Sequence, residues 1–182
     1  MKITVVGRGH VGGGLARLWS AAGHEVAGLG RDGGDAAGSD VVVVAVPGPA
    51  IADALGRVGG LNGQVTIDAC NLYGERDTAF PSLSHQIKSI TGGPTAKSFS
   101  TNFAVAYDRI AAQRVTPSNL FAAEEGARAV TERLIRDAGY EPLYVGDLDP
   151  GARLLEDGSA LTRAIAGEIG PFFYRYAPVD RL

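Results

Sequence analysis

Three features of this sequence predict an α/β fold in which a mostly parallel β-sheet carries helices on both faces. Short apolar runs alternate with segments of helical period along the chain, which is the pattern of repeated strand–helix units. Two runs, residues 2–6 and 41–46, are rich in β-branched residues, as expected for strands buried on both faces. A glycine-rich turn joins the first run to the first helical segment. Together these features predict a Rossmann-like, doubly wound sheet.

The same patterns place the individual elements in chain order. Strands are expected at residues 2–6, 24–28, 41–46, 65–68, 95–100, 119–123 and 141–145. Helices are expected at residues 11–22, 50–58, 102–112, 124–138 and 150–169. Gly23 is a plausible cap for the first helix. With 182 residues, the chain is expected to form a single domain, residues 1–182, with a C-terminal helix and an aromatic tail at about 149–182.

The composition argues against several classes of function. Lysine and arginine number 17 against 20 aspartates and glutamates, which gives a net charge of −3. We therefore expect no nucleic acid or membrane partner, because no basic field attracts phosphate groups. No apolar run approaches the roughly 20 residues of a membrane-spanning helix. No signal peptide is recognisable either, so a cytoplasmic protein is expected. One cysteine and three histidines form no ligand cluster, so no metal site is predicted.

The turn after the first strand has the sequence Gly7-Arg8-Gly9-His10-Val11-Gly12, which is a G-x-G-x-x-G motif. In this motif Gly7 allows the tight turn, Gly9 lets the backbone approach a pyrophosphate, and Gly12 allows the helix to pack closely on the strand. The helix N-terminus offers free N–H groups and a partial positive charge to phosphates. We therefore predict that all six residues belong to a dinucleotide-binding site. The alternative is a glycine turn that only packs a helix against a strand.

The end of the second predicted strand distinguishes NAD from NADP. Proteins that bind NAD usually place an acidic residue there for the ribose hydroxyls, whereas this sequence has Gly30-Arg31-Asp32. The Arg31 guanidinium can pair with a 2′-phosphate, which a carboxylate would repel. Arg8 could reach the same phosphate from the glycine turn. We predict NADP(H) with Gly30 and Arg31 at the site. In a different register Asp32 would be the ribose ligand and would shift the preference toward NAD.

Two further strand ends are expected at the same edge of the sheet. Val46 and Pro47 leave space for the nicotinamide ribose, and Cys70 and Asn71 follow the next strand. Cys70 is interpreted as a small pocket residue, because no histidine or acid at a recognisable spacing supports it as a nucleophile. His10 is expected to border the phosphates and not to act as a base. No catalytic side chain is predicted.

Four segments resemble the F420-dependent NADP oxidoreductases, which transfer hydride between NADP and the 5-deazaflavin coenzyme F420. The segments are residues 1–26, Gly30-Arg31, Lys97-Ser98-Phe99-Ser100-Thr101, and residues 138–156 with Gly-Tyr-Glu-Pro and Ala-Arg-Leu-Leu-Glu. The resemblance implies that a planar acceptor lies over the carboxyl edge of the sheet, where Phe99, Ser100 and Thr101 would contact it. The chain departs from the family in the short stretch between Arg31 and Val41, and at Ser98 and Ser100, where the family has alanine and asparagine.

The sequence and the resemblance together predict an NADP(H)-dependent oxidoreductase with coenzyme F420 or a similar planar molecule as its redox partner. Its cofactors would carry the hydride chemistry, so no nucleophile is required. The alternatives are a reductase of a flavin, a quinone or another acceptor, and a non-catalytic NADP-binding sensor. Apolar residues on the last helix and in the aromatic tail predict a homodimer, namely Leu154, Leu155, Leu161, Ile165 and the rings at 172–176. The alternative is that these residues are buried in the hydrophobic core of the same chain.

Overall fold

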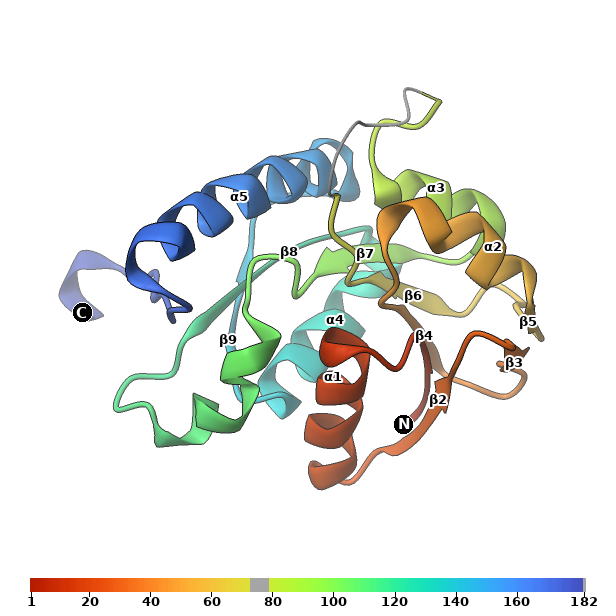
Figure 1. Cartoon of the computed structure of the whole chain (residues 1–182), viewed down its shortest axis with the longest axis horizontal. Helices are drawn as coiled ribbons and strands as arrows, with labels where there is room; N and C mark the ends of the chain where they lie inside the picture. The colour runs from red at the N-terminus through yellow and green to blue at the C-terminus, as the bar shows by residue number, and fades with distance from the viewer. Residues whose placement is uncertain (73–78, 182) are drawn as a thin grey trace.

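A seven-stranded sheet forms the centre of the computed structural model, which describes residues 1–72 and 79–181 (Figure 1). Neighbouring strands are parallel except for one antiparallel pair, β7 and β8. This arrangement confirms the predicted Rossmann-like, doubly wound and mostly parallel sheet. The strands lie in the order β2 (Glu25–Leu29), β1 (Lys2–Val6), β4 (Val41–Val44), β6 (Val65–Asp68), β7 (Thr95–Ser98), β8 (Ser118–Ala123) and β9 (Glu141–Tyr144).

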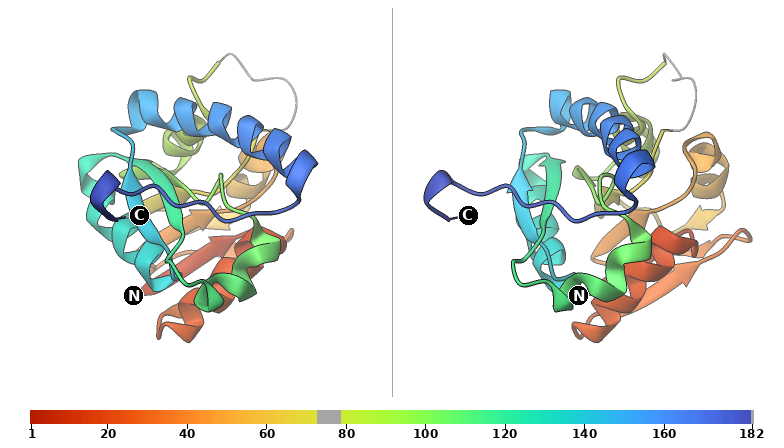
Figure 2. Two further views of the ribbon diagram at one scale, coloured as in Figure 1. Left: turned by 90° about the vertical axis from the view of Figure 1, so that its left-hand side faces the viewer. Right: turned by 60° about the vertical axis from the view of Figure 1, so that its left-hand side comes forward.

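Helices cover both faces of this sheet (Figures 1 and 2). One face carries α1 (His10–Ala21), α4 (Glu125–Asp137) and the 3₁₀ helix η2 (Ala104–Ala112). The other face carries α2 (Ile51–Gly56), α3 (Leu83–Thr91) and α5 (Leu148–Ile169). The chain also contains four shorter elements: η1 (Gly48–Ala50), η3 (Val179–Arg181), β3 (Gly34–Asp35) and β5 (Val58–Gly59). Among residues 1–72 and 79–181, no helix combines the length and the apolar composition needed to cross a membrane.

The two hydrophobic cores meet at β4, whose four valines are all buried. Val41 and Val43 face the core beneath α1 and α4, which also contains Trp19. Val42 and Val44 face the core beneath α2 and α3. Because successive side chains of a strand point to opposite faces, a strand between two cores needs an apolar residue at every position. The unbroken valine run is therefore explained by burial on both faces.

Three segments differ from the sequence-based expectation. Helix α3 was not expected; it begins after Ser82, whose hydroxyl accepts a hydrogen bond from the His85 N–H. The helix expected at 102–112 is the 3₁₀ helix η2, in which the buried Tyr107 and Ile110 lie three residues apart, as a three-residue turn requires. The helix expected at 50–58 ends at Gly56, because Val58 pairs with Gly34 in the small β3–β5 sheet. The strands expected at 2–6 and 65–68 have these bounds, and the remaining expected elements are present with ends shifted by one or two residues.

A fully buried ion network lies beneath the carboxyl edge of the sheet. It joins Lys97 at the end of β7 to Asp68 of β6 and Glu156 of α5. Lys97 Nζ lies 2.9 Å from Asp68 Oδ2 and 3.9 Å from Glu156 Oε1. It also donates a 2.7 Å hydrogen bond to the carbonyl oxygen of Cys70. A single cation therefore holds two strands, one helix and the turn after β6 together.

The two carboxylates of this network are themselves hydrogen-bonded. Asp68 accepts from the Ser84 hydroxyl at 2.6 Å and from the Cys70 N–H at 2.8 Å. Glu156 accepts from the N–H of Leu83 at 2.7 Å, in the first turn of α3. Buried charges are tolerated when they are paired and their remaining hydrogen-bonding capacity is used. Both conditions are met here.

We expect the substitution Lys97→Met to lower the free energy of unfolding by about 3–5 kcal/mol, because it leaves two buried carboxylates without their cation. Urea denaturation at neutral pH measures this change. Lys88→Met is the matched control: Lys88 pairs with Glu124, but both side chains are partly exposed, so its cost should stay below about 1 kcal/mol. Equal losses for the two variants would contradict a special role for the buried network.

Candidate functional site

The glycine turn between β1 and α1 lies against the end of β4. A Cβ atom at Gly7, which has a φ of +105°, would be 2.3 Å from the carbonyl oxygen of Ala45. A Cβ atom at Gly12 would be 2.0 Å from the carbonyl oxygen of Gly7. Both distances are far below a van der Waals contact distance, so the fold itself requires glycine at these two positions. The turn therefore places the first residues of α1 at the edge of the sheet.

Gly9 differs from these two glycines. Its φ of −72° is open to any residue, and a Cβ atom built on it has no heavy atom within 4 Å. Gly9 precedes α1, whose first N–H groups have no acceptor within the helix. The folded chain alone therefore gives no reason for a glycine here. A group that approaches the backbone from outside would give one.

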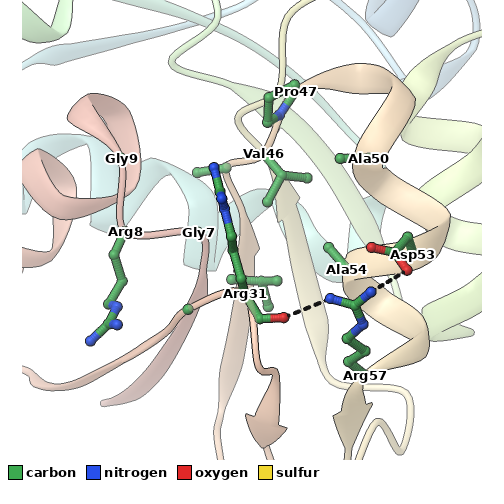
Figure 3. A pocket seen from close by; sticks show the side chains of 13 residues that line it. Gly7, Arg8, Gly9, Arg31, Val46, Pro47, Ala50, Asp53, Ala54 and Arg57 are labelled. Carbon is green, nitrogen blue, oxygen red and sulfur yellow. Dashed lines mark hydrogen bonds and ion pairs between the residues drawn. The ribbon is translucent and has the colours of Figure 1, made fainter.

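The turn borders a cavity at the carboxyl edge of the sheet (Figure 3), named the larger cavity because a neighbouring one at this edge has only about 180 Å³. This cavity has a volume of about 510 Å³, within the range of small-molecule sites. It lies between the ends of β1 and β4. At this point the strand order changes direction, because β2 lies on one side of β1 whereas β4 and β6 lie on the other. Open α/β sheets bind ligands in such a crevice. The lining residues are Val6, Gly7, Arg8, Gly9, Gly30, Arg31, Ala45, Val46, Pro47, Ala50, Asp53, Ala54 and Arg57.

Two predicted arginines border this cavity. Figure 3 shows Arg31 extending from the end of β2 toward Val46 and Pro47. Arg8 lies on the other side of the turn and points away from Arg31. Its guanidinium covers Gly30, because a Cβ atom built there would be 2.8 Å from Arg8 Nη2. The alternative residue, Asp32, is exposed and is not among the described residues that line the cavity.

Arg57 is a third arginine at the cavity, and no pattern in the sequence predicted it there. It follows α2, and its Nη1 donates a 2.8 Å hydrogen bond to the backbone carbonyl of Arg31. Its Nη2 lies 2.8 Å from Asp53 Oδ1 (Figure 3). Arg57 thereby supports the turn that carries Arg31. No local signal predicts this contact, since the two arginines are 26 positions apart.

A second, smaller cavity of about 180 Å³ lies between the start of α1, the turns after β6 and β7, and α5. It brings together Asn71, Ser100 and Thr101 of the predicted set, and Val11 from the glycine motif. Its other lining residues were not predicted: Asn102, Phe103, Ala104, Ser159, Thr162 and Arg163. Most of the predicted site residues are thus divided between two neighbouring cavities, whereas His10, Gly12, Cys70 and Phe99 are not among the described lining residues of either.

Two predicted residues lie in the cores and line neither of these cavities. Phe99, which has a φ of +61°, packs edge-on against Trp19 with ring centroids 5.7 Å apart. The Cys70 side chain is buried, and its thiol donates a 3.4 Å hydrogen bond to the Val44 carbonyl. Burial raises the pKa of this thiol, and the Asp68 carboxylate raises it further. Cys70 therefore stays protonated, and the expectation that it and Phe99 line the cleft is not met.

His10 is the first residue of α1 and is exposed. It lines a shallow hollow along the outside of α1, together with Arg17 and Asp108, which form a 2.7 Å ion pair. It is not among the described residues of either cavity at the sheet edge. That His10 borders the phosphates of a bound coenzyme stays a prediction.

The aromatic tail packs on the turn that forms the smaller cavity, and it crosses this region in Figure 2. Phe172 contacts Phe103 with ring centroids 5.3 Å apart. The hydroxyl groups of Tyr174 and Thr101 are 2.6 Å apart, and burial raises the pKa of Tyr174 to about 12. Ser118 donates its N–H to the Tyr174 carbonyl at 2.8 Å. Part of the tail therefore packs against its own chain and is not free to contact a second copy.

Comparison with solved structures gives matches of the same fold. A candidate F420-dependent NADP reductase from Arthrobacter sp. FB24 matches with a TM-score of 0.80 and 23% identity, over 98% of this chain and 100% of that one. A hypothetical protein, SMa0349 from Sinorhizobium meliloti, matches with a TM-score of 0.64 and 22% identity, over 83% and 86% of the two chains.

A larger protein matches as well. The reductive aminase from Aspergillus terreus, in complex with NADPH and ethyl-5-oxohexanoate, gives a TM-score of 0.67 and 17% identity. The match covers 92% of this chain but 62% of that one. No family model matches this sequence, and no curated protein sequence matches it significantly. At these identities the likenesses establish the Rossmann-like fold of this chain.

Proposed function

We propose that this chain is an NADP(H)-dependent oxidoreductase whose coenzyme lies in the larger cavity. One observation carries the proposal: Gly9 has no steric reason to be glycine in the folded chain, yet it borders that cavity at the start of α1. A pyrophosphate held by the N–H groups of this turn would need the space that a Cβ atom would fill. The fold shared with an NADPH-bound reductive aminase supports the same proposal.

The arginines around the cavity favour NADP(H) over NAD(H). Arg31 and Arg8 flank Gly30 at the end of β2, near the position where the adenosine ribose lies in this type of fold. Guanidinium groups form strong, charge-assisted hydrogen bonds with phosphate. Arg57 contributes by holding the Arg31 carbonyl. The chain would thus bind a 2′-phosphate although its overall charge is negative.

We expect the substitution Gly9→Ala to weaken NADPH binding at least tenfold, or by about 1.4 kcal/mol, because its methyl group would occupy the pyrophosphate space. The unfolding free energy should change by less than about 1 kcal/mol, the scale of an N-cap effect. Calorimetric titration and urea denaturation measure the two quantities. Gly167→Ala, on α5 with nothing near its Cβ position, is the control. Unchanged NADPH affinity in Gly9→Ala would refute the proposed position of the pyrophosphate.

Arg31→Ala should weaken NADPH binding by roughly tenfold or more and leave NADH binding unchanged, because a hydrogen bond to a charged group contributes about 1.5–3 kcal/mol. The measurement is a titration of both coenzymes into the same protein. Asp32→Ala serves as control and should alter neither affinity. If Asp32→Ala instead weakened NADH, Asp32 would be the ribose ligand. Equal losses for both coenzymes in Arg31→Ala would contradict the assignment of Arg31.

We further propose that the second substrate is a planar hydride acceptor or donor such as coenzyme F420, placed at the smaller cavity. The position of Asn71, Ser100 and Thr101 there supports this proposal. When bound, NADPH supplies the hydride; the protein would orient the two rings and exclude water. NADPH oxidation assayed separately with F420, FAD, FMN and a quinone tests it. Turnover with F420 alone supports the deazaflavin, turnover with the others supports a different reductase, and tight binding without turnover supports a sensor.

A homodimer through α5 is also proposed. Leu154, Leu161 and Ile169 are 58%, 65% and 69% exposed and, with the partly exposed Ile165, follow one side of the helix, whereas Leu155 is buried toward the sheet. The C-terminal segment after Tyr176 extends away from the body (Figure 2), so it could reach a second copy. A self-complementary helix face suits a two-fold axis.

Light scattering at micromolar concentration should give twice the mass of one chain, and the substitution Leu161→Asp should halve the measured mass. A monomeric wild type would exclude the dimer.

A further inference from the structure

Apart from the charged Arg163, the polar side chains that line the smaller cavity fall into two groups. Those of Thr101, Asn102, Ser159 and Thr162 all have hydrogen-bond partners within the chain. The partners are the Tyr174 hydroxyl for Thr101 and Asn102, the Ser118 carbonyl for the Asn102 amide, the Glu156 carbonyl for Ser159 and the Gly158 carbonyl for Thr162. These four side chains are therefore committed to the fold.

Asn71 and Ser100 form the second group. The Asn71 Oδ1 and Ser100 Oγ atoms are buried, and neither has a hydrogen-bond partner among residues 1–72 and 79–181. Ser100 as a whole is 5% exposed. A buried polar atom without a partner is unfavourable by roughly 1–3 kcal/mol, and native proteins rarely retain one without a reason. Two such atoms in one cavity mark a place where a ligand could supply the missing partners.

The positions of both residues are fixed by their neighbours. Asn71 follows Cys70, whose carbonyl and N–H groups are held by Lys97 and Asp68 of the buried ion network. Ser100 precedes Thr101, which is held by Tyr174 of the C-terminal tail. The two unpartnered atoms thus come from two turns that are each tied down independently. Such preorganisation is typical of residues that recognise a ligand.

The chemistry of the two atoms limits the ligand. The amide oxygen of Asn71 only accepts hydrogen bonds, so it needs an N–H or O–H group. The Ser100 hydroxyl donates one hydrogen bond and also accepts. Val11, Phe103 and Ala104 provide apolar walls, and among the described lining residues Arg163 is charged and none is acidic. An N–H group beside a carbonyl group, carried on a flat ring, satisfies these requirements.

We propose that Asn71 and Ser100 bind the amide or imide edge of a planar ring, with the ring's N–H donated to Asn71 Oδ1 and its carbonyl accepting from Ser100 Oγ. The inference rests on the proposed function, because it places a reacting ring at this cavity. At about 180 Å³, the cavity is below the 300–1,000 Å³ typical of whole ligands, so it holds part of a larger molecule. The carboxamide of nicotinamide and the pyrimidinedione edge of a flavin or deazaflavin both carry this chemistry.

Two pairs of probes distinguish these sources. NADP⁺ is compared with its 3-acetylpyridine analogue, which lacks the carboxamide N–H. Riboflavin, titrated in the presence of NADP⁺, is compared with N3-methylriboflavin, which lacks the imide N–H. The wild-type protein should prefer the N–H form of one pair by roughly tenfold, because the methyl form leaves Asn71 Oδ1 unpaired. Preference within the first pair identifies the carboxamide, and preference within the second identifies the imide.

Variants connect the preference to the residues. Asn71→Ala should abolish the preference, whereas Asn71→Asp should retain it, because aspartate keeps an acceptor oxygen at the same position. Ser100→Ala should weaken the binding of the preferred probe and leave a smaller preference. Asn62→Ala, at an exposed site, is the control and should behave as wild type. Urea denaturation of every variant establishes that it is folded.

The outcomes separate this inference from the proposed function. Adenosine 2′,5′-bisphosphate contains the adenosine part of NADP and no nicotinamide, so its binding tests the larger cavity alone. If it binds but the wild-type protein shows no preference within either pair, the inference is overturned and the proposed function stands. A preference that survives in Asn71→Ala overturns the assignment of Asn71. If neither the bisphosphate nor NADP⁺ binds, the proposed function itself fails.

Discussion

The close contact between the glycine turn and the end of β4 is the constraint on which the site depends. The Ala45 carbonyl occupies the place of a side chain at Gly7, and the Gly7 carbonyl occupies the place of one at Gly12. Helix α1 can therefore start directly above the ends of β1 and β4. The larger cavity exists because the connections after β1 and after β2 run to opposite sides of β1. This reversal of strand order opens a crevice beside the helix N-terminus.

The second constraint is the ion network of Lys97, Asp68 and Glu156. It connects the turn after β6 to β7 and to the start of α3 through hydrogen bonds that are all inside the protein. Its charges are removed from water, so the network tolerates little displacement of its members. Because the Cys70 carbonyl is one of its acceptors, the position of Asn71 at the smaller cavity depends on a lysine that contacts no solvent.

The two cavities differ in character, and the difference suits a reaction between two molecules. The larger one is bordered by Arg8, Arg31 and Arg57, which favour an anionic group. The smaller one is lined mainly by neutral polar and apolar residues, with one arginine, Arg163, and it holds the unpartnered atoms of Asn71 and Ser100. In the proposed function, charge would select and anchor one ligand, whereas hydrogen-bond geometry would orient a ring. Val11, at the start of α1, lines the smaller cavity directly beside the glycine turn of the larger one.

The sequence by itself determined the fold class, the seven strands of the main sheet, the glycine turn and the position of Arg31, because periodicity and turn chemistry involve residues close together in the chain. Only the tertiary structure decided that Arg57 supports Arg31, that Cys70 and Phe99 belong to the cores, and that Asn71 and Ser100 share a cavity with α5. It also decided that Lys97 is buried. These contacts join distant segments, and their geometry depends on how helices and strands pack, which local patterns do not encode.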